Sequence, residues 1–266
     1  MEQNARIIPT IHQVRTGPRG NAPVVLIHPL GLDLTFWDRQ IDYLCDEFDL
    51  VSFDLPGNGL SSGEAGDWEL ERVTEVLAQV VRDLGTADAH LVGISIGSMI
   101  AQSFALRMPH ATRSLTLIGS AASFSVQSRR YLSDIAELAS SEGMRAIVDG
   151  SMPYWFSEAT RARRPDILDR AAKTLLQNAP QIHAAMWRMV AAFDLESELH
   201  RITCPTLVLV GDQDVSTPPE SSARIAKLIP GAEFHILPGG AHMLPIESPD
   251  LVNQCLAGFL RKTNAS

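Results

Sequence analysis

The stretch His90-Leu91-Val92-Gly93-Ile94-Ser95-Ile96-Gly97-Ser98 decides the fold. Residues 90–94 are mostly apolar and predict a buried strand, while residues 96–108 predict a helix that ends before Pro109. The turn between them has the pattern Gly-x-Ser-x-Gly. Glycines at both ends allow a sharp strand-to-helix turn that exposes the serine hydroxyl at the edge of a sheet. Ser95 would then lie at a helix N-terminus, where free N–H groups and the helix dipole stabilise negative charge.

Strand and helix patterns alternate on both sides of this turn. Short apolar runs predict strands, and longer segments with apolar residues every three or four positions predict helices. The predicted strands are 24–28, 50–54, 90–94, 115–119, 206–211 and 233–237, and the predicted helices are 36–48, 68–84, 96–108, 220–228 and 251–260. This alternation is typical of an α/β fold with a mostly parallel central sheet flanked by helices.

One long stretch interrupts the alternation. From about residue 124 to residue 198 the sequence has no convincing strand, is helical in pattern and is rich in arginine. We therefore predict an α/β core made of residues 1–122 and 199–266. Residues 123–198 would form a helical cap, inserted after the strand at about 115–119.

Composition and charge exclude several classes of partner. The 266 residues carry a net charge of −9, whereas binding to nucleic acid needs basic patches that displace counterions from phosphates. The apolar runs are strand-sized, far short of the roughly 20 residues that span a bilayer. Residues 1–6 contain no apolar signal segment. We expect a cytoplasmic protein with a small-molecule partner and with neither a nucleic-acid nor a membrane partner; its oligomeric state stays open.

No pattern in the sequence predicts a metal or cofactor site. Cys45, Cys204 and Cys255 are widely spaced, and the histidines do not have metal-ligand spacing. The glycine-containing stretch 54–61 lacks both the lysine of a phosphate-binding loop and the glycine order of a dinucleotide site. We interpret it as a tight structural turn and predict no metal and no cofactor.

Two loops downstream of Ser95 carry the groups that a serine nucleophile needs. The hydroxyl is a weak nucleophile, so it requires a base, and the base requires an orienting acid. Gly211-Asp212-Gln213-Asp214 follows one predicted strand and Gly239-Gly240-Ala241-His242 follows another. The carboxyl ends of parallel strands meet at one edge of a sheet, where sites collect. We predict His242 as base and Asp214 as acid, with Asp212 as the alternative acid.

Backbone amides should stabilise the negative oxygen of the tetrahedral intermediate. The amide of Ile96, directly after the nucleophile, is one donor. The loop His28-Pro29-Leu30-Gly31 follows the predicted strand 24–28, and because Pro29 has no N–H, Leu30 is the other donor. We expect His28 to shape this loop by hydrogen bonding; a second base is the alternative.

Together these residues resemble the α/β-hydrolase superfamily over nearly the whole chain. The matching segments, in the order of the family, are 28–31, 54–61, 93–97, 211–218 and 240–242. Within the superfamily, residues 30–38 and 202–219 are most similar to 3-oxoadipate enol-lactonases, which open an enol-lactone ring by ester hydrolysis in aromatic catabolism. The elbow differs from the usual Ser-Met-Gly-Gly of that subfamily, because here it is Ser95-Ile96-Gly97-Ser98.

The resemblance implies a serine hydrolase that cleaves a carboxylic ester or lactone through an acyl-enzyme. The alternatives are a general carboxylesterase or perhydrolase, a C–C bond hydrolase of ring-fission products, and a non-catalytic small-molecule receptor of the same fold. C–C hydrolases typically carry Asn before the serine and Trp after the histidine, where this chain has Ile94 and Met243.

The predicted cap should cover Ser95 and select the substrate. Candidates for the pocket wall are Trp155, Phe156, Met186, Trp187, Met189 and Met243, and packing within the protein interior is the alternative for each. The carboxylate of an enol-lactone would need a cation, because the acidic protein repels it. Arg188 is one candidate, and the others are Arg129, Arg130, Arg161, Arg163 and Arg164.

Overall fold

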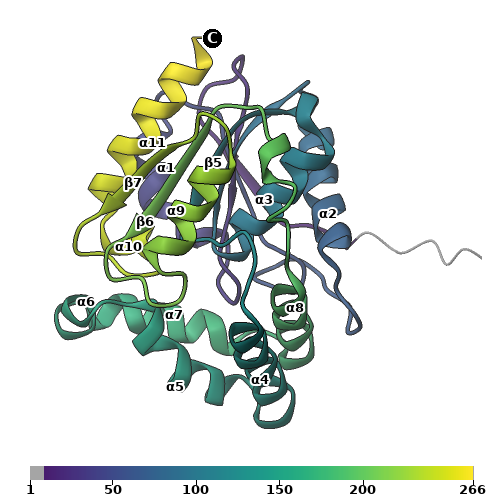
Figure 1. Ribbon diagram of the computed structural model, residues 1–266, viewed down its shortest axis with the longest axis vertical. Coiled ribbons are helices and arrows are strands. Elements are labelled where there is room, and N and C mark those ends of the chain that lie inside the picture. Colours follow the sequence, from purple (N-terminus) through teal and green to yellow (C-terminus); the bar gives the residue numbers. More distant parts are fainter. Residues whose placement is uncertain (1–8, 266) are drawn as a thin grey trace, which may run out of the picture.

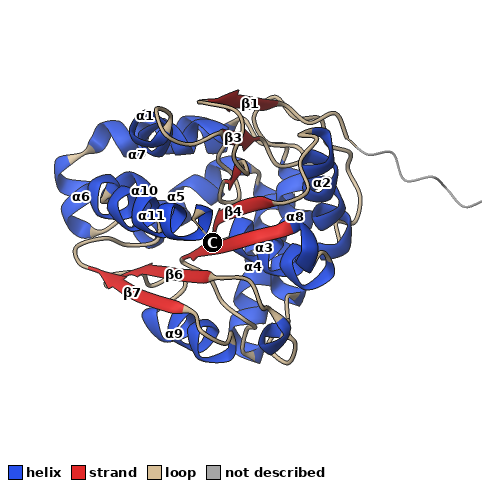
Figure 2. Ribbon diagram, turned by 90° about the horizontal axis from the view of Figure 1, so that it is seen from above, coloured by secondary structure: helices blue, strands red, loops and turns tan. Residues whose placement is uncertain are grey.

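The computed structural model describes residues 9–265 and contains a seven-stranded sheet with helices on both faces (Figures 1 and 2). The strand order is β1-β3-β2-β4-β5-β6-β7, with every neighbouring pair parallel except β1 and β3. The strands are β1 (Gln13–Thr16), β2 (Val24–Ile27), β3 (Leu50–Phe53), β4 (Ala89–Ile94), β5 (Thr112–Ile118), β6 (Thr206–Gly211) and β7 (Glu233–Leu237). The predicted α/β fold with a mostly parallel sheet is confirmed.

Two strands differ from the sequence-based expectation. β1 was not predicted, because Gln13–Thr16 is mostly polar and forms the antiparallel edge of the sheet, where half of its residues are exposed. β5 begins at Thr112, three residues before its apolar run, because the polar residues Thr112 and Ser114 also pair with β4. In both places the strand is fixed by pairing with a neighbour rather than by its own hydrophobicity.

Each face of the sheet is covered by an apolar cluster. On one face, α2 (Leu70–Asp83), α3 (Ile96–Arg107) and α9 (Pro219–Leu228) contribute buried side chains. On the other face the contributors are α1 (Asp38–Leu44), α10 (Leu244–Glu247) and α11 (Pro249–Asn264). Short 3-10 helices span Leu34–Trp37, Pro109–Ala111 and Leu199–Arg201. β2, β3, β4 and β6 are buried along their whole length, so the loops that follow them start from fixed points.

Residues 123–198, named here the helical insertion, connect β5 to β6. They contain α4 (Val126–Glu142), α5 (Met144–Trp155), α6 (Glu158–Arg163), α7 (Pro165–Leu176) and α8 (Pro180–Ala192), which lie together beyond one end of the sheet (Figure 1). An isolated antiparallel bridge pairs Ser123 with Asp194 at the two ends of the insertion. Most buried residues of α8 join the cluster on one face of the sheet, and those of α5 and α7, together with Ala184 of α8, join the other. The insertion therefore packs as a continuation of the core.

Two further expectations concern membranes and metals. Within residues 9–265 no helix is long and apolar enough to cross a bilayer. The same residues contain no group of three or more histidine, cysteine or acidic side chains arranged to hold a metal ion. The expectation of no signal segment concerns residues 1–6, which lie outside the described residues.

Candidate active site

Ser95 occupies a strained backbone conformation between β4 and α3. Its φ of 55° and ψ of −122° make it the one non-glycine residue with positive φ within residues 9–265. Such a conformation costs about 1–3 kcal/mol and persists only where the surroundings impose it. A Cβ on Gly93 would lie 2.4 Å from the Gly97 carbonyl, and one on Gly97 would lie 2.3 Å from the carbonyl oxygen of Ile27. The glycines are therefore required by close backbone packing around the turn.

His242 and Asp214 form a buried hydrogen-bonded pair at the ends of neighbouring strands. The Nδ1 atom of His242 donates to Oδ2 of Asp214 over 2.9 Å, and both side chains are almost fully buried. A carboxylate can only accept, so the proton of the neutral ring is on Nδ1 and Nε2 is free to take one up. Asp212 is exposed and accepts from the Gly239 amide at 2.8 Å, so this geometry favours Asp214 as the orienting acid.

The pair lies close to the backbone of Ser95. The Ser95 amide donates to the carbonyl of Ile118 at the end of β5 over 3.0 Å. The next residue, Gly119, has φ 49°, and a Cβ there would lie 3.1 Å from Asp214 Oδ2 and 3.3 Å from His242 Nδ1. Within residues 9–265 the Ser95 hydroxyl makes no hydrogen bond, and its role as nucleophile stays a prediction.

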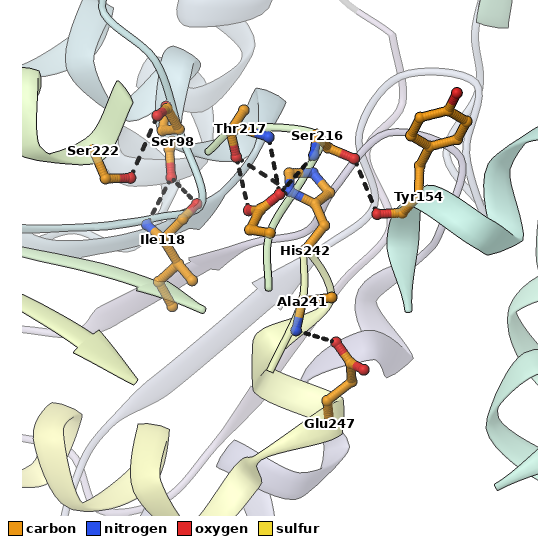
Figure 3. Close-up of polar contacts among 11 residues, drawn as sticks. Ser98, Ile118, Tyr154, Ser216, Thr217, Ser222, Ala241, His242 and Glu247 are labelled. Carbon is orange, nitrogen blue, oxygen red and sulfur yellow. Dashed lines mark hydrogen bonds and ion pairs between the residues drawn. The ribbon is translucent and has the colours of Figure 1, made fainter. Parts of the chain in front are cut away.

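Thr217, which the sequence analysis did not single out, holds the acid in place. Its hydroxyl donates to Oδ2 of Asp214 over 2.9 Å and lies 3.2 Å from Nδ1 of His242 (Figure 3). Oδ1 of Asp214 accepts from the amides of Ser216 and Thr217, each at 2.9 Å. Both carboxylate oxygens are thus fully engaged. Thr217 follows Asp214 by three residues in a loop, a spacing that allows such a turn but does not identify it.

The end of α5 bonds to both loops of the pair. The Ser216 hydroxyl donates to the carbonyl of Tyr154 over 3.1 Å. The amide of Met243 donates to the carbonyl of Trp155 over 3.0 Å. Glu247 bridges the same regions, because its carboxylate accepts from the amide of Ala241 (Figure 3) and from that of Ser157, each at 2.8 Å. The insertion is therefore fixed to the histidine loop by one backbone hydrogen bond and by the carboxylate of Glu247.

The loop after β2 is held from both sides. His28 is fully buried; its Nδ1 donates to the Pro29 carbonyl and its Nε2 accepts from the Leu55 amide, both at 2.8 Å. Burial lowers the pKa of His28, so its ring is neutral and shapes the loop. Gly31, with φ 83°, donates its amide to Asn58 at 3.2 Å, and its carbonyl accepts from Asn178 of the insertion at 2.8 Å.

The two amides predicted to bind the oxyanion are available. Neither Leu30 nor Ile96 donates its N–H to an acceptor within residues 9–265. The loops that carry them also touch, since Gly97 packs against the carbonyls of Ile27 and His28. Oxyanion binding by these amides stays a prediction.

The predicted substrate-contacting residues fall into different environments. Trp155, Phe156, Met186, Met189 and Met243 are buried within the two apolar clusters. Trp187 is half-buried and donates from Nε1 to Nε2 of His183 over 2.9 Å. Arg188 is exposed and donates to the Ser140 hydroxyl of α4 over 3.1 Å. Contact of any of these side chains with substrate stays a prediction.

The other arginines named as cation candidates lie on the insertion surface. Arg129 donates to the carbonyls of Phe124 and Ala191 and pairs with Asp194. Arg164 pairs with Asp166 at 2.8 Å. The remaining three, Arg130, Arg161 and Arg163, are exposed.

A comparison with known protein families supports the resemblance that the motifs indicate. The sequence profile of the Alpha/beta hydrolase family matches residues 24–254. The chain belongs to this family. The predicted α/β-hydrolase fold and the prediction that the protein is a hydrolase are thereby confirmed.

Individual relatives of this α/β-hydrolase include lactone- and ester-cleaving enzymes. 3-Oxoadipate enol-lactonase 2 of Acinetobacter baylyi is 24% identical over 93% of this chain and 92% of its own length. The solved structure of the enol-lactonase from Burkholderia xenovorans LB400 has a TM-score of 0.90 and 28% identity, covering 94% of this chain and 96% of its own. A thermophilic esterase from Thermogutta terrifontis has a TM-score of 0.89 and 31% identity, covering 96% and 94%. The predicted enol-lactonase-like resemblance is confirmed.

Proposed function

We propose that the protein is a serine hydrolase that cleaves a carboxylic ester or lactone through an acyl-enzyme at Ser95. One observation carries the proposal: the His242–Asp214 pair packs against Gly119. The residue before it, Ile118, accepts the hydrogen bond from the Ser95 amide, so the pair lies close to Ser95. Three residue types with complementary roles thus come from three separate strand ends. A structural role alone gives no reason for this combination.

The reaction follows from the bonding of each group. The Ser95 hydroxyl attacks the acyl carbon while Nε2 of His242 takes its proton, and Asp214 stabilises the resulting imidazolium. The amides of Leu30 and Ile96 donate to the oxyanion. Collapse of the intermediate breaks the ester C–O bond, and His242 returns the proton to the leaving oxygen. Water then attacks the acyl-enzyme with His242 as base, which releases the carboxylic acid and restores Ser95.

The substrate we propose is an enol-lactone of the 3-oxoadipate type, supported by the similarity to enol-lactonases over nearly the whole chain. In a lactone the leaving oxygen stays attached to the acyl group, so a pocket that encloses the whole ring suits it. The helical insertion would provide this enclosure as a cap, with Trp155, Met186, Trp187 and Met243 as candidate walls. Its contacts with the loops of His242 and Leu30 support this role.

A simpler carboxylesterase activity is the second candidate. It is favoured by the 31% identity to the Thermogutta terrifontis esterase. The arginines of the insertion also favour it. Arg129, Arg164 and Arg188 already bond to other groups of the protein rather than being left free for the carboxylate of an enol-lactone. A simple ester makes no demand for a cation beside the acyl group.

The decisive experiment compares 3-oxoadipate enol-lactone with p-nitrophenyl acetate and butyrate. Ser95→Ala should lower kcat by several orders of magnitude and abolish both the burst of p-nitrophenol and the acyl adduct on the peptide that contains residue 95. Ser103→Ala is the matched control, because it removes a buried hydroxyl from α3, the helix that follows Ser95; the Ser103 hydroxyl accepts from Thr74. Hydrolysis by Ser95→Ala at the wild-type rate would show that the nucleophile is wrong.

The same assay separates the two substrate classes. A kcat/KM for the lactone at least a hundredfold above that for the esters would support the enol-lactonase. Turnover of the esters alone would leave an esterase, and saturable binding of the lactone without product would favour the receptor alternative.

A further inference from the structure

His183 of α8 has a buried hydrogen-bond donor that the protein does not use. Its Nε2 accepts from Nε1 of Trp187 over 2.9 Å, one helical turn along the same helix. Because an indole nitrogen can only donate, Nε2 carries no proton and the neutral ring has its N–H at Nδ1. This Nδ1 is buried and has no hydrogen-bond partner. An unpaired buried donor costs stability, so its persistence needs an explanation.

The unpaired edge of the ring faces the loop predicted to bind the oxyanion. A Cβ built on Gly31 would lie 3.1 Å from Cε1 and 3.7 Å from Nδ1 of His183. Gly31 directly follows Leu30, and its carbonyl already accepts from Asn178 of the same insertion. The Nδ1–H therefore lies in the part of the insertion that packs on the loop of the predicted oxyanion donor Leu30.

The chemistry of His183 limits what it can bind. Burial lowers the pKa of His183 to about 3, so the ring is uncharged at any pH near neutrality. An uncharged donor compensates the burial of a neutral carbonyl oxygen, whereas a buried carboxylate needs a positive charge or several donors, as Asp214 has. Trp187 keeps the donor on Nδ1 by occupying the other ring nitrogen.

We infer that His183 is a specificity-determining residue, which donates from Nδ1 to a neutral carbonyl oxygen in the acyl chain of the substrate. The inference rests on the proposed acyl transfer by Ser95 and favours esters or lactones whose acyl part carries a second, neutral carbonyl over the 3-oxoadipate enol-lactone, whose second carbonyl group is a carboxylate. His183 takes no part in bond making, and its contribution is to bind and orient the acyl chain.

The test uses p-nitrophenyl esters that differ only in the acyl chain: hexanoate, 4-oxohexanoate, 5-oxohexanoate and the hemiester of hexanedioic acid. We expect at least one oxo ester to be hydrolysed with a kcat/KM roughly 10-fold above hexanoate, the selectivity of one hydrogen bond to a buried donor. His183→Phe should remove this preference, measured as the ratio of kcat/KM for the oxo ester to kcat/KM for hexanoate in the same variant. His183→Asn, whose amide N–H lies near the Nδ1 position, should keep the preference even where its overall rate is lower.

Each other outcome overturns a specific part of the inference. Equal loss on hexanoate and the oxo esters in His183→Phe would reveal a purely structural role. A preference for the hemiester that His183→Phe abolishes would overturn the neutral acceptor. Failure of the proposed function looks different, because hydrolysis of every ester would then survive Ser95→Ala.

Discussion

The buried polar groups of Asp214, at the sheet edge, and of His183, in the helical insertion, differ in how completely they are hydrogen-bonded. Asp214 accepts from two amides, from the Thr217 hydroxyl and from His242, so its carboxylate is fully engaged. His183 is as deeply buried, yet one of its two ring nitrogens has no partner. A fully bonded group keeps one geometry, whereas an open donor gains its bond only from a ligand.

This difference matches two different tasks. Acyl transfer needs groups fixed before the substrate arrives, because reorganisation at the moment of reaction raises the barrier. Selection of a substrate needs a few polar groups that are left free in an otherwise apolar surface. If this is correct, substitutions at the sheet edge should change the rate of acyl transfer, and substitutions in the insertion should change the choice of substrate.

The largest expected effect is a loss of kcat on substitution of Asp214, whose carboxylate is fully hydrogen-bonded. Asp214→Asn should lower kcat about 10⁴-fold with little change in unfolding temperature, because the amide no longer fixes the Nδ1–H tautomer of His242. Steady-state kinetics with p-nitrophenyl butyrate and thermal unfolding measure the two quantities. Asp212→Asn is the matched control, since its side-chain oxygen can still accept from Gly239. A larger loss in Asp212→Asn than in Asp214→Asn would reverse the assignment of the acid.

Thr217→Val should have a smaller effect on the same carboxylate. The substitution keeps the side-chain shape and both amide bonds to Asp214, but removes the hydroxyl donor at 2.9 Å. We expect kcat to fall roughly 10-fold with an unchanged KM, as for the loss of one hydrogen bond to a charged group. Thr263→Val provides the control, because that hydroxyl bonds only to carbonyls of its own helix. A change confined to KM would mean that Thr217 contacts the substrate instead.

Asn178→Ala probes the junction between the two regions. Its amide donates to the carbonyl of Gly31 and to two carbonyls at the end of α7. Removing it should cost about 1–2 kcal/mol of stability and reduce kcat about 5-fold, because the loop of Leu30 loses its bond to the insertion. Urea unfolding and ester kinetics check both values, with the exposed neighbour Gln177→Ala as control. Unchanged kcat in a destabilised Asn178→Ala would show that the insertion does not position this loop.

The sequence predicted the sheet edge well because its signals are local. An apolar strand, a Gly-x-Ser-x-Gly turn and a helix follow one another without a gap, and Asp214 and His242 each follow a strand. Edge strand β1 was missed because a polar segment becomes a strand only through its pairing with β3. Local patterns thus predicted the elements that are buried on both faces of the sheet.

The supporting residues could not be predicted for a different reason. Asn178 and Glu247 act on backbone groups of Gly31, Ala241 and Ser157, which have no side-chain signature in the sequence. The helical pattern of residues 124–198 predicted helices there, but neither their bounds nor the direction of each side chain relative to the rest of the fold. Arg188 and His183 are five residues apart on α8, yet one is exposed and bonded to Ser140 while the other is buried over Gly31.

The last expected effect concerns stability rather than activity and isolates the unpaired donor of His183 in the insertion. The pKa of His183 is about 3 in the folded protein but about 6.5 in an unfolded chain, so below pH 6.5 the unfolded state binds a proton that the folded state does not. Stability is therefore lost as pH falls, by about 2 kcal/mol between pH 7 and pH 5 for this one group. Urea unfolding at the two pH values should show a pH dependence smaller by that amount in His183→Phe than in the wild type. His28 and His90, whose pKa values burial also lowers, contribute equally to both proteins and cancel in the difference. An unchanged pH dependence in His183→Phe would mean that His183 is not held neutral in the insertion.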